Sequence, residues 1–585
     1  MDFSPGKDAA PFFTSRPYTT WEIIKAYWQS PHKFSAYVFT ASVLFLTIML
    51  VGFDVVFNYW YNYFYNALQE YKVHATIRLL FVFTILAGIN IVIAVYRYYL
   101  SQLFGLKWRR WLTEQLMGRW LSKKGYYYLE TFDVKTDNPD QRIQEDVNGL
   151  ISNSIGLVVG LVGAVTTFPA FVYILWTLSG VLTLSLGSFG TIHIHGYLVW
   201  AGLIYNLVGT LITFKIGRPL VKLNFEQQQR EATFRFSAID LRSHAEQVAM
   251  YRGEHHQKSI LNSHFLRVLE NWYAIILRQK KLLWFTGGFN QAAVLLPLLV
   301  ALPNYFGKVF LLGGLMQSIR AFSSVQESLS YLINSYTTIA EWRATCSRLT
   351  TFLNHLYEAE MKAEKLDHMV IKEQQENTIN IKDLVIKTPL DQMLLGKIDE
   401  AFIQGNNYVI KGESGIGKST FIRAIAGVWP FASGEVTFPR HKRVMYLPQQ
   451  PYMPIGTLAE AILFPDKQDP LLEKNLEKVL RDCHLEEFIP RLTEVAHWSE
   501  QLSPGEQQRI AFARVLLHKP DWVFLDESTS MLDNANEAHL YHLLQKELPN
   551  CSLISVGHHA SVDVFHQHVI DMTRYSHKIN DHALV

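Results

Sequence analysis

Long apolar segments dominate the first 340 residues of the chain. Several of them reach the length of about 20 residues that a helix needs to cross a bilayer. They lie at Phe34–Phe57, Ile77–Leu100, Leu150–Leu178, Tyr197–Phe214, Leu282–Leu302 and Phe306–Ala340. The pattern predicts an all-α membrane domain with six transmembrane helices over residues 1–346, followed by a linker over residues 347–377.

The apolar pattern changes near residue 378. Short runs rich in β-branched and aromatic residues replace the long segments, as is typical of buried strands. These runs lie at Tyr408–Ile410, Val444–Leu447, Trp522–Leu525 and Leu553–Val556. Residues 378–585 are therefore predicted to form an α/β domain, and the whole chain a multi-domain membrane protein.

Composition agrees with a membrane domain. The chain is 49% hydrophobic and 18% charged, with a mean hydropathy of +0.05. Its net charge of +2 is too small for a protein that binds nucleic acid through bulk charge, so no nucleic-acid partner is expected. The three cysteines, Cys346, Cys483 and Cys551, are scattered without metal or disulfide spacing, which indicates a reducing compartment.

The distribution of lysine and arginine predicts the orientation of the predicted spans. The long segments between spans two and three and between spans four and five are rich in both residues, whereas the connection Ser179–Gly196 has neither. Basic segments face the cytoplasm in membrane proteins. Both long segments, both termini and the α/β domain are therefore expected on the cytoplasmic side.

Two short stretches of these basic segments are candidates for coupling the membrane domain to the α/β domain. One is NPDQRIQED, which contains Asp140 and Gln141. The other is AEQVAMYRGE, which contains Glu246 and Gly253. Composition alone is equally compatible with solvated surface helices at both places.

Polar residues recur at helical spacing inside two of the predicted spans. In span six they share one face and include Gln317, Arg320 and Glu327, and in span one they include Asn58 and Asn62. A charge at mid-membrane costs about 2.5–3.5 kcal/mol on insertion scales, so these side chains should avoid lipid. They predict a polar transport cavity that takes an unknown solute, or hydrogen bonds between neighbouring helices.

A phosphate-binding loop follows the first short run of the α/β domain. The residues Gly412, Glu413, Ser414, Gly415, Ile416, Gly417, Lys418, Ser419 and Thr420 match G-x-x-x-x-G-K-[ST] between a strand and a helix. Inward-pointing backbone N–H groups and a helix N-terminus bind anions there. Lys418 is expected to reach the phosphates of ATP or GTP and Ser419 to hold Mg²⁺.

Polar residues end the other short runs. Asp526 is placed to hold Mg²⁺, and the adjacent Glu527 to act on the attacking water as a general base. Gln449 can sense the metal and the γ-phosphate, and His558 can orient both the phosphate and the water. The expected catalytic set is Glu527, His558, Lys418 and Gln449, with Ser419, Gln449 and Asp526 at the metal.

A second anion site is expected where another helix begins. Ser503 and the backbone N–H of Gly505 open the helix that follows Leu502. Because this site lies on a different element from Lys418, we expect it to bind a phosphate held by another copy of the domain.

These residues and their order resemble the ATPase domains of ABC transporters. Ser419, Gln449, Ser503, Asp526, Glu527, Asp533 and His558 occupy the positions of Walker A, Q-loop, signature, Walker B, D-loop and H-loop. The resemblance implies that Asp533 also contributes to the ATP site. Six spans followed by one such domain resemble an ABC half-transporter with the exporter-type fold, which works as a dimer, here most simply a homodimer in membrane lipid.

Further motifs narrow the resemblance. NPDQRIQED, AEQVAMYRGE, LPQQPYMPIGTL and LSPGEQQR are similar to the group that joins SbmA/BacA-like bacterial transporters to the peroxisomal fatty-acyl ABC transporters of subfamily D. The resemblance extends from about Trp21 to the end of the chain. It implies an ATP-driven transporter of the bacterial inner membrane that takes up bulky polar solutes such as cobalamin, modified peptides or bleomycin-like compounds.

Two positions depart from the ABC pattern. Pro504 stands where many ABC proteins have glycine, and Thr388 where an aromatic residue commonly stacks on adenine.

Two other functions stay open as alternatives to solute uptake. The first alternative function is the export or flipping of fatty-acyl or other lipid substrates. The second is a membrane ATPase that regulates a partner without moving a solute.

Overall fold

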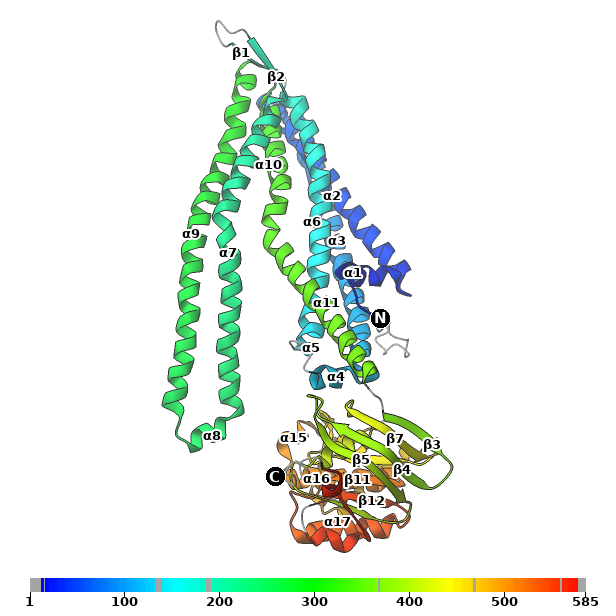
Figure 1. The fold of residues 1–585 in the computed structure, drawn as a ribbon. Helices are drawn as coiled ribbons and strands as arrows, with labels where there is room; N and C mark the ends of the chain where they lie inside the picture. The colour runs from blue at the N-terminus through cyan, green and yellow to red at the C-terminus, as the bar shows by residue number, and fades with distance from the viewer. Residues whose placement is uncertain are drawn as a thin grey trace. The chain divides into compact units, whose positions relative to one another are not determined.

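The computed structural model describes residues 12–14, 16–132, 138–179, 181–185, 191–366, 369–466, 470–557 and 560–576. The chain forms two compact units, which Figure 1 labels element by element. One unit comprises Met1–Tyr126 and Lys135–Tyr357, and the other comprises Tyr127–Val134 and Glu358–Val585.

The first unit is helical. Within the described residues, five of its helices are long and apolar enough to cross a membrane. They are α2 (Lys33–Gln69), α3 (Val73–Leu121), α6 (Val147–Ser179), α7 (Tyr197–Ser243) and α9 (Glu254–Phe306). Several apolar helices therefore confirm the predicted membrane domain.

The sixth predicted span is a helix of a different character. It forms α10 (Leu312–Asn334), which packs against α2, α6, α7 and α9 and continues as α11 (Tyr336–Lys365). Because of its polar residues, α10 is not among the helices that are apolar enough to span a membrane. Contacts with four other helices accommodate a helix with one polar face.

The connection between α6 and α7 contains two strands that we did not predict. Strands β1 (Val181–Ser185) and β2 (Thr191–His195) pair in antiparallel fashion. Where α6 leads into these strands and α7 begins after them, an apolar cluster joins α6, α7, α9 and α10. It includes Phe171, Tyr197, Ala301 and Phe322. From there α7 and α9 run as a long hairpin that ends at α8 (Ala245–Met250) (Figure 1).

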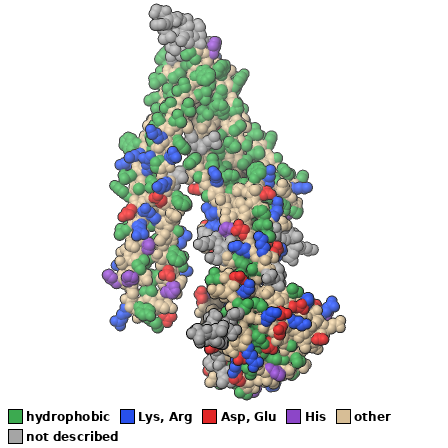
Figure 2. All heavy atoms as spheres, viewed as in Figure 1, with side chains coloured by type: hydrophobic (Ala, Val, Ile, Leu, Met, Phe, Trp, Pro, Cys, Tyr) green, Lys and Arg blue, Asp and Glu red, His purple; other side chains and the backbone are tan. Residues whose placement is uncertain are grey.

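The surface of this unit changes along its helices. Figure 2 shows hydrophobic side chains gathered near the cluster that joins α6, α7, α9 and α10, and charged side chains along the part of the hairpin nearer α8. A short helix, α1 (Thr20–Gln29), packs against α2 and α3. Its first turn is fixed by a capping box between Thr19 and Glu22.

The second unit is built on a five-stranded parallel sheet. The strand order is β13-β6-β12-β11-β8. The strands are β13 (His568–Asp571), β6 (Tyr408–Lys411), β12 (Ser552–Val556), β11 (Trp522–Asp526) and β8 (Val444–Leu447). Ile410 and Asp526 both lie opposite Val556, so the carboxyl ends of three neighbouring strands meet at one edge of the sheet.

Two apolar cores cover the sheet. One includes α12 (Lys418–Ile425) and a second sheet with the order β3-β7-β4-β5, formed by β3 (Met369–Gln374), β7 (Ala432–Pro439), β4 (Thr378–Lys387) and β5 (Met393–Ile403). The other includes α13 (Leu458–Leu463), α14 (Pro470–Asp482), α16 (Pro504–His518) and α17 (Asn534–Glu547). The predicted α/β domain is therefore confirmed. The expected linker region 347–377 holds the end of α11 and β3.

Candidate functional site

The loop between β6 and α12 has the backbone that an anion site requires. Gly412, Gly415 and Gly417 have φ values of +150°, +78° and +112°. A side chain at Gly417 would place its Cβ 2.8 Å from Leu394 Cδ2. Glycine therefore permits both the positive φ angles and the close approach of the loop to β5.

Lys418 begins α12 and points back into this loop. Its Nζ donates to the carbonyl oxygens of Gly412 at 2.8 Å and Glu413 at 3.0 Å. The residue is 5% exposed, and burial lowers the pKa of Lys418 while Glu527 and Asp526 act in the opposite direction. The loop thus holds an ammonium group among groups that bind phosphate.

Ser419 and Asp526 bring two hard oxygen ligands together. The Ser419 hydroxyl donates to Asp526 Oδ1 at 2.8 Å. Asp526 is 8% exposed, and burial raises the pKa of its carboxyl group, with the bond from Ser419 opposing this effect. A hydroxyl and a carboxylate fit the oxygen chemistry that Mg²⁺ prefers.

Glu527 directly follows β11 and has an unusual backbone conformation. Its φ is +47°, a conformation that is rare outside glycine and is often found at functional sites. Its N–H donates to the Val556 carbonyl oxygen at 3.2 Å, and Gln449 Nε2 donates to Glu527 Oε2 at 3.2 Å. The structure thus brings Gln449, Asp526, Glu527, Lys418 and Ser419 together, whereas His558 lies outside the described residues.

The predicted second anion site lies at the start of α16. Ser503 is the N-cap, and its hydroxyl donates to Glu506 Oε2 at 2.8 Å. A Cβ on Gly505 would lie 3.2 Å from the Met531 carbonyl oxygen, so this turn packs closely on the segment after β11. Pro504 occupies the first helical turn, where a missing N–H breaks no helical hydrogen bond.

Asp533 begins the helix that follows this segment. As the N-cap of α17 it accepts a hydrogen bond from the Asn536 N–H at 2.7 Å, which lowers the pKa of its carboxyl group. The side chain is exposed. It is therefore an ionised group in the segment that packs on Gly505.

Gln508 connects parts of this site and was missed in the sequence. It is 1% exposed, its Nε2 donates to the Gln449 carbonyl oxygen at 3.2 Å, and its Oε1 accepts from the Met531 N–H at 3.0 Å. Its single side chain therefore links α16 to the segments that hold Gln449 and Asp533. Sequence spacing alone gives no indication of these partners.

Arg514, also on α16, was missed as well. It is 6% exposed and donates to the carbonyl oxygens of Tyr452 at 2.7 Å and Ala461 at 2.7 and 3.0 Å. Burial lowers its pKa to about 10. The available indication was an arginine inside the otherwise apolar stretch IAFARVLLH.

Thr388 lies in the turn between β4 and β5. Its N–H donates to the Gln392 carbonyl oxygen at 2.8 Å, and Leu390 in the same turn is 81% exposed. The described turn residues 388–392 include no aromatic side chain. Leu390 is therefore the apolar group that this turn presents.

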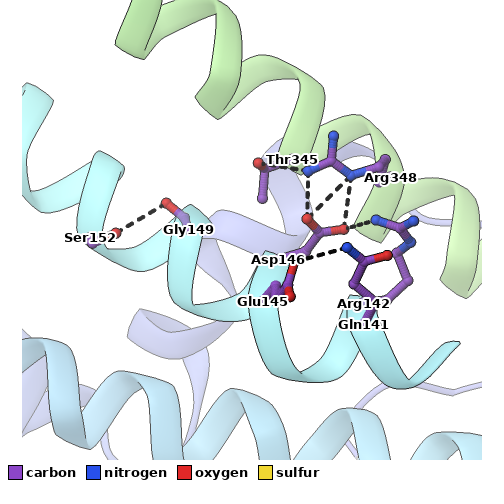
Figure 3. A network of polar contacts seen from close by, with 8 residues as sticks. All are labelled: Gln141, Arg142, Glu145, Asp146, Gly149, Ser152, Thr345 and Arg348. Atoms are coloured by element: carbon purple, nitrogen blue, oxygen red, sulfur yellow. Dashed lines mark hydrogen bonds and ion pairs between the residues drawn. The ribbon is translucent and has the colours of Figure 1, made fainter. Parts of the chain in front are cut away.

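The NPDQ segment is tied to α11. Gln141 Nε2 donates to Glu145 Oε2 at 2.8 Å, while Asp140 is exposed. Asp146, which is 4% exposed, pairs with Arg142 and accepts from Arg348 Nε at 2.9 Å (Figure 3). The start of α6 is therefore held by charge to the helix that leads to the α/β domain.

The second predicted coupling segment forms α8 and the turn after it. Glu246 lies exposed on α8, and the Gly253 N–H closes the turn by donating to the Val248 carbonyl oxygen at 2.9 Å. Met250 and Tyr251 are 75% and 87% exposed. The tip of the α7–α9 hairpin therefore presents apolar groups next to charged ones.

A third segment belongs to the α/β unit although it comes from the membrane half of the sequence. Residues Tyr127–Val134 group with this unit, and they include most of α4 (Gly125–Thr131). The ring of Phe132 packs edge-on against Phe431 at 5.3 Å, and Phe431 contacts Trp429 at 5.4 Å. The aromatic run GYYYLETF was the indication in the sequence.

The polar residues of spans one and six fall into two groups. Asn58 and Gln317 are 0% and 1% exposed, and Asn58 Nδ2 donates to the Gln317 carbonyl oxygen at 3.2 Å. Asn62 Nδ2 donates to Gln317 Oε1 at 2.5 Å. The hydrogen bonds of these three residues join α2 to α10. They agree with the second interpretation of the sequence, in which polar residues bond neighbouring helices to each other.

The charged residues form the second group. Arg320 and Glu327 are exposed, and the Arg320 guanidinium lies 4.3 Å from the centre of the Tyr61 ring. Asp54, exposed on α2, interacts electrostatically with Arg320 and with Glu327. Two acids and one base therefore share a face of the helical unit.

Comparison with known proteins covers both units. Residues 23–306 match the family model of ABC transporter transmembrane region 2, and residues 395–530 match that of the ABC transporter. An uncharacterized ABC transporter ATP-binding protein of Haemophilus influenzae is 34% identical over 95% of this chain and 92% of its own length.

Two further relatives are similar over most of their length. The inner membrane ABC transporter ATP-binding protein YddA of Escherichia coli is 32% identical over 92% of this chain and 94% of its own. The human lysosomal cobalamin transporter ABCD4 is 25% identical over 84% of each chain, which confirms the resemblance to subfamily D. Because the similarity spans the membrane helices as well as the nucleotide loop, the chain belongs to the ABC transporter family and couples ATP hydrolysis to transport.

Proposed function

We propose that two copies of this chain form an ATP-driven importer of bulky polar solutes in the bacterial inner membrane, with the ATPase domain in the cytoplasm. The observation that carries this proposal is the exposed group of Asp54, Arg320 and Glu327 on α2 and α10. A charged side chain inside a membrane is costly when it faces lipid. The charged group on α2 and α10 therefore favours a water-filled path. A relative named as a cobalamin transporter supports a large polar solute.

The shape of the helical unit supports a homodimer. The α7–α9 hairpin exposes large apolar side chains far from the cluster that joins it to the other helices, including Phe236, Trp272 and Tyr273. Such side chains are commonly covered at an interface. A second copy of the chain supplies an apolar surface of the same kind.

The residues of the ATPase unit fit the binding and hydrolysis of ATP. Lys418 exchanges its two loop carbonyl partners for phosphate oxygens, and the loop N–H groups complete the anion site. Ser419, Gln449 and Asp526 would hold Mg²⁺, which when bound neutralises charge on the phosphates. Glu527 accepts a proton from the attacking water as a general base, and His558 orients that water.

The second copy completes each site. Ser503 and the Gly505 N–H of one copy bind the phosphate that Lys418 of the other copy holds. Asp533 follows Met531 and Leu532, which pack on Gly505, and this supports a place for it near the shared phosphate. ATP therefore joins the two ATPase domains, and hydrolysis separates them.

Coupling to the membrane helices runs through three segments. Phe132 connects the chain that leaves α3 to Phe431 of the ATPase unit. Asp140 and Gln141 lie beside the Asp146 pairs, and α8 with Glu246 and Gly253 carries the exposed tip residues. Movement of the ATPase domains is thereby transmitted to the cavity.

Transport in liposomes tests the proposal. Protein is reconstituted in vesicles loaded with labelled cobalamin, and ATP is added outside, so that only copies with an external ATPase domain work. Import then appears as ATP-dependent loss of cobalamin from the lumen, absent for Glu527→Gln. Accumulation in the lumen, movement of a labelled acyl lipid instead, or hydrolysis without movement of either would support export, lipid transport or a regulatory ATPase.

A further inference from the structure

A large apolar cavity lies in the helical unit, and Asp54, Arg320 and Glu327 are not among the residues that line it. Its volume is about 680 Å³, within the range of about 300–1,000 Å³ that is typical of ligand sites. Helices α1, α2, α3, α6, α10 and α11 all contribute to its walls. The wall residues on α2 and α6 belong to helices apolar enough to cross a membrane.

Three pairs of polar groups in the walls are hydrogen-bonded to each other. Trp28 Nε1 donates to Thr40 Oγ1 at 3.3 Å, and Trp342 Nε1 donates to Ser154 Oγ at 2.7 Å. The Tyr331 hydroxyl donates to the Leu157 carbonyl oxygen at 2.7 Å. Most of the other lining residues are apolar, which suits an acyl chain better than a polar solute.

The charge in the described walls of the cavity is positive only. Lys25 on α1 is exposed, and among the described residues that line the cavity it is the one charged side chain. Its Nζ lies 4.8 Å from the centre of the Trp21 ring. A single cation beside an apolar cavity, without an acid in the same walls, complements an amphiphile with an anionic head.

The helix that carries Lys25 is firmly placed. Tyr27 stacks on Trp108 of α3 at 5.9 Å, and Trp28 contacts the same ring edge-on at 4.9 Å. Just before α1, the Tyr18 N–H donates to Asn354 Oδ1 of α11 at 2.7 Å. The cation therefore has a fixed place at the cavity, and the aromatic residues around it are of the kind found at membrane interfaces.

We propose that this cavity binds an anionic phospholipid of the surrounding bilayer, with an acyl chain between α1 and α6 and the phosphate at Lys25. The membrane supplies such lipids at high local concentration, and basic residues at its cytoplasmic surface attract them. The bound lipid is separate from the transported solute, whose proposed path is lined by the charged group on α2 and α10.

The test uses the full chain in nanodiscs of phosphatidylcholine with a small fraction of phosphatidylglycerol that carries a photoreactive acyl chain. Labelling followed by peptide mass spectrometry should concentrate on wall residues of α1 and α6. Unlabelled phosphatidylglycerol should compete, and phosphatidylcholine should not. Lys25→Gln should reduce this labelling several-fold, whereas Lys215→Gln on α7 should not.

A second pair of variants separates the cavity from the general lipid surface. Val158 is 47% exposed in the cavity wall, and Val165, on the same helix outside it, is 61% exposed. Both side chains are exposed, so neither belongs to a buried core. Val158→Trp should fill the cavity and reduce α1 and α6 labelling several-fold, while Val165→Trp should leave it unchanged.

Three results would overturn the proposal. Labelling spread evenly over lipid-facing helices and indifferent to Val158→Trp would show no defined site. Better competition by a free fatty acid than by phosphatidylglycerol would assign the cavity to another ligand. A disulfide between two copies of a Val158→Cys variant would show that a second copy covers it. None of these results depends on cobalamin transport.

Discussion

The adjacent carboxylates Asp526 and Glu527 have different surroundings, which suit them to different tasks. Asp526 is 8% exposed and receives the Ser419 hydroxyl, so it belongs to the metal side of the site. Glu527 is more open, has a positive φ and receives Gln449 Nε2. The change of backbone direction between them separates the proposed metal ligand from the proposed general base.

We predict that Glu527→Gln nearly stops hydrolysis while ATP binding survives. The amide keeps the shape and the contact with Gln449 but loses basicity, and general bases contribute about 10²–10⁴-fold to rates. ATP should therefore stay trapped and hold two ATPase domains closed, as measured by retained nucleotide and by cross-linking.

Two variants serve as controls for this prediction. Lys418→Ala should lose ATP binding and leave the domains open. Adding Ser503→Arg to Glu527→Gln should release the closed state by filling the second phosphate site. Hydrolysis near the wild-type rate in Glu527→Gln would refute the assigned role.

The residues of this site differ in how far the sequence could predict them. The loop from Gly412 to Thr420 is a continuous motif, so its backbone and its lysine could be predicted from order alone. Gln508 and Arg514 act through partners on other segments, and their roles become visible only when α16 is packed against those segments. Asn58 and Gln317 show the same limit, because periodicity cannot distinguish a cavity face from a helix contact.

At the scale of elements, α4 shows that sequence order and structural grouping can differ. Its residues follow a membrane helix, yet from Tyr127 onward they group with the ATPase unit. The aromatic run was visible in the sequence, but its partner Phe431 lies after the nucleotide loop. The strands β1 and β2 were missed for a different reason, since the connection Ser179–Gly196 was considered only for its lack of lysine and arginine.

We predict that Phe132→Ala uncouples hydrolysis from transport. Aromatic pairs contribute about 0.5–1.5 kcal/mol beyond burial, so loss of the Phe431 contact should loosen α4 without unfolding the sheet. Transport in the liposome assay should fall several-fold more than basal ATPase activity.

The matched control is Tyr126→Ala, which removes an aromatic ring that is 51% exposed on α4, the helix that ends just before Phe132. It should leave the ratio of transport to hydrolysis unchanged. An equal loss in both variants would mean that α4 contributes only helix stability.

At the scale of the whole molecule, the division into a helical and an α/β unit follows from one change of apolar pattern. The long apolar segments and the short buried runs differ in length and in their content of β-branched and aromatic residues, and these differences were enough to predict both folds. The count of spanning helices was harder, because α10 carries polar residues that pack against other helices. The placement of basic residues adds a prediction about sidedness.

We predict that a cysteine at His195, an exposed residue at the end of β2, reacts with an impermeant maleimide in intact cells. A cysteine at the exposed Asp140 should react only after the cells are permeabilised. The unmodified chain is a suitable background because its three cysteines are buried. The opposite labelling pattern would reverse the proposed orientation.

The contact between Ser503 and Glu506 has a consequence for energy use in the cell. In the single chain the serine hydroxyl already has a carboxylate partner on its own helix. In the proposed dimer, two empty ATPase domains that meet keep this bond and gain no phosphate contact, whereas in loaded domains the hydroxyl exchanges the carboxylate for a phosphate. A pair of domains without ATP therefore gains nothing at Ser503 by closing, so we expect closure to depend on bound ATP.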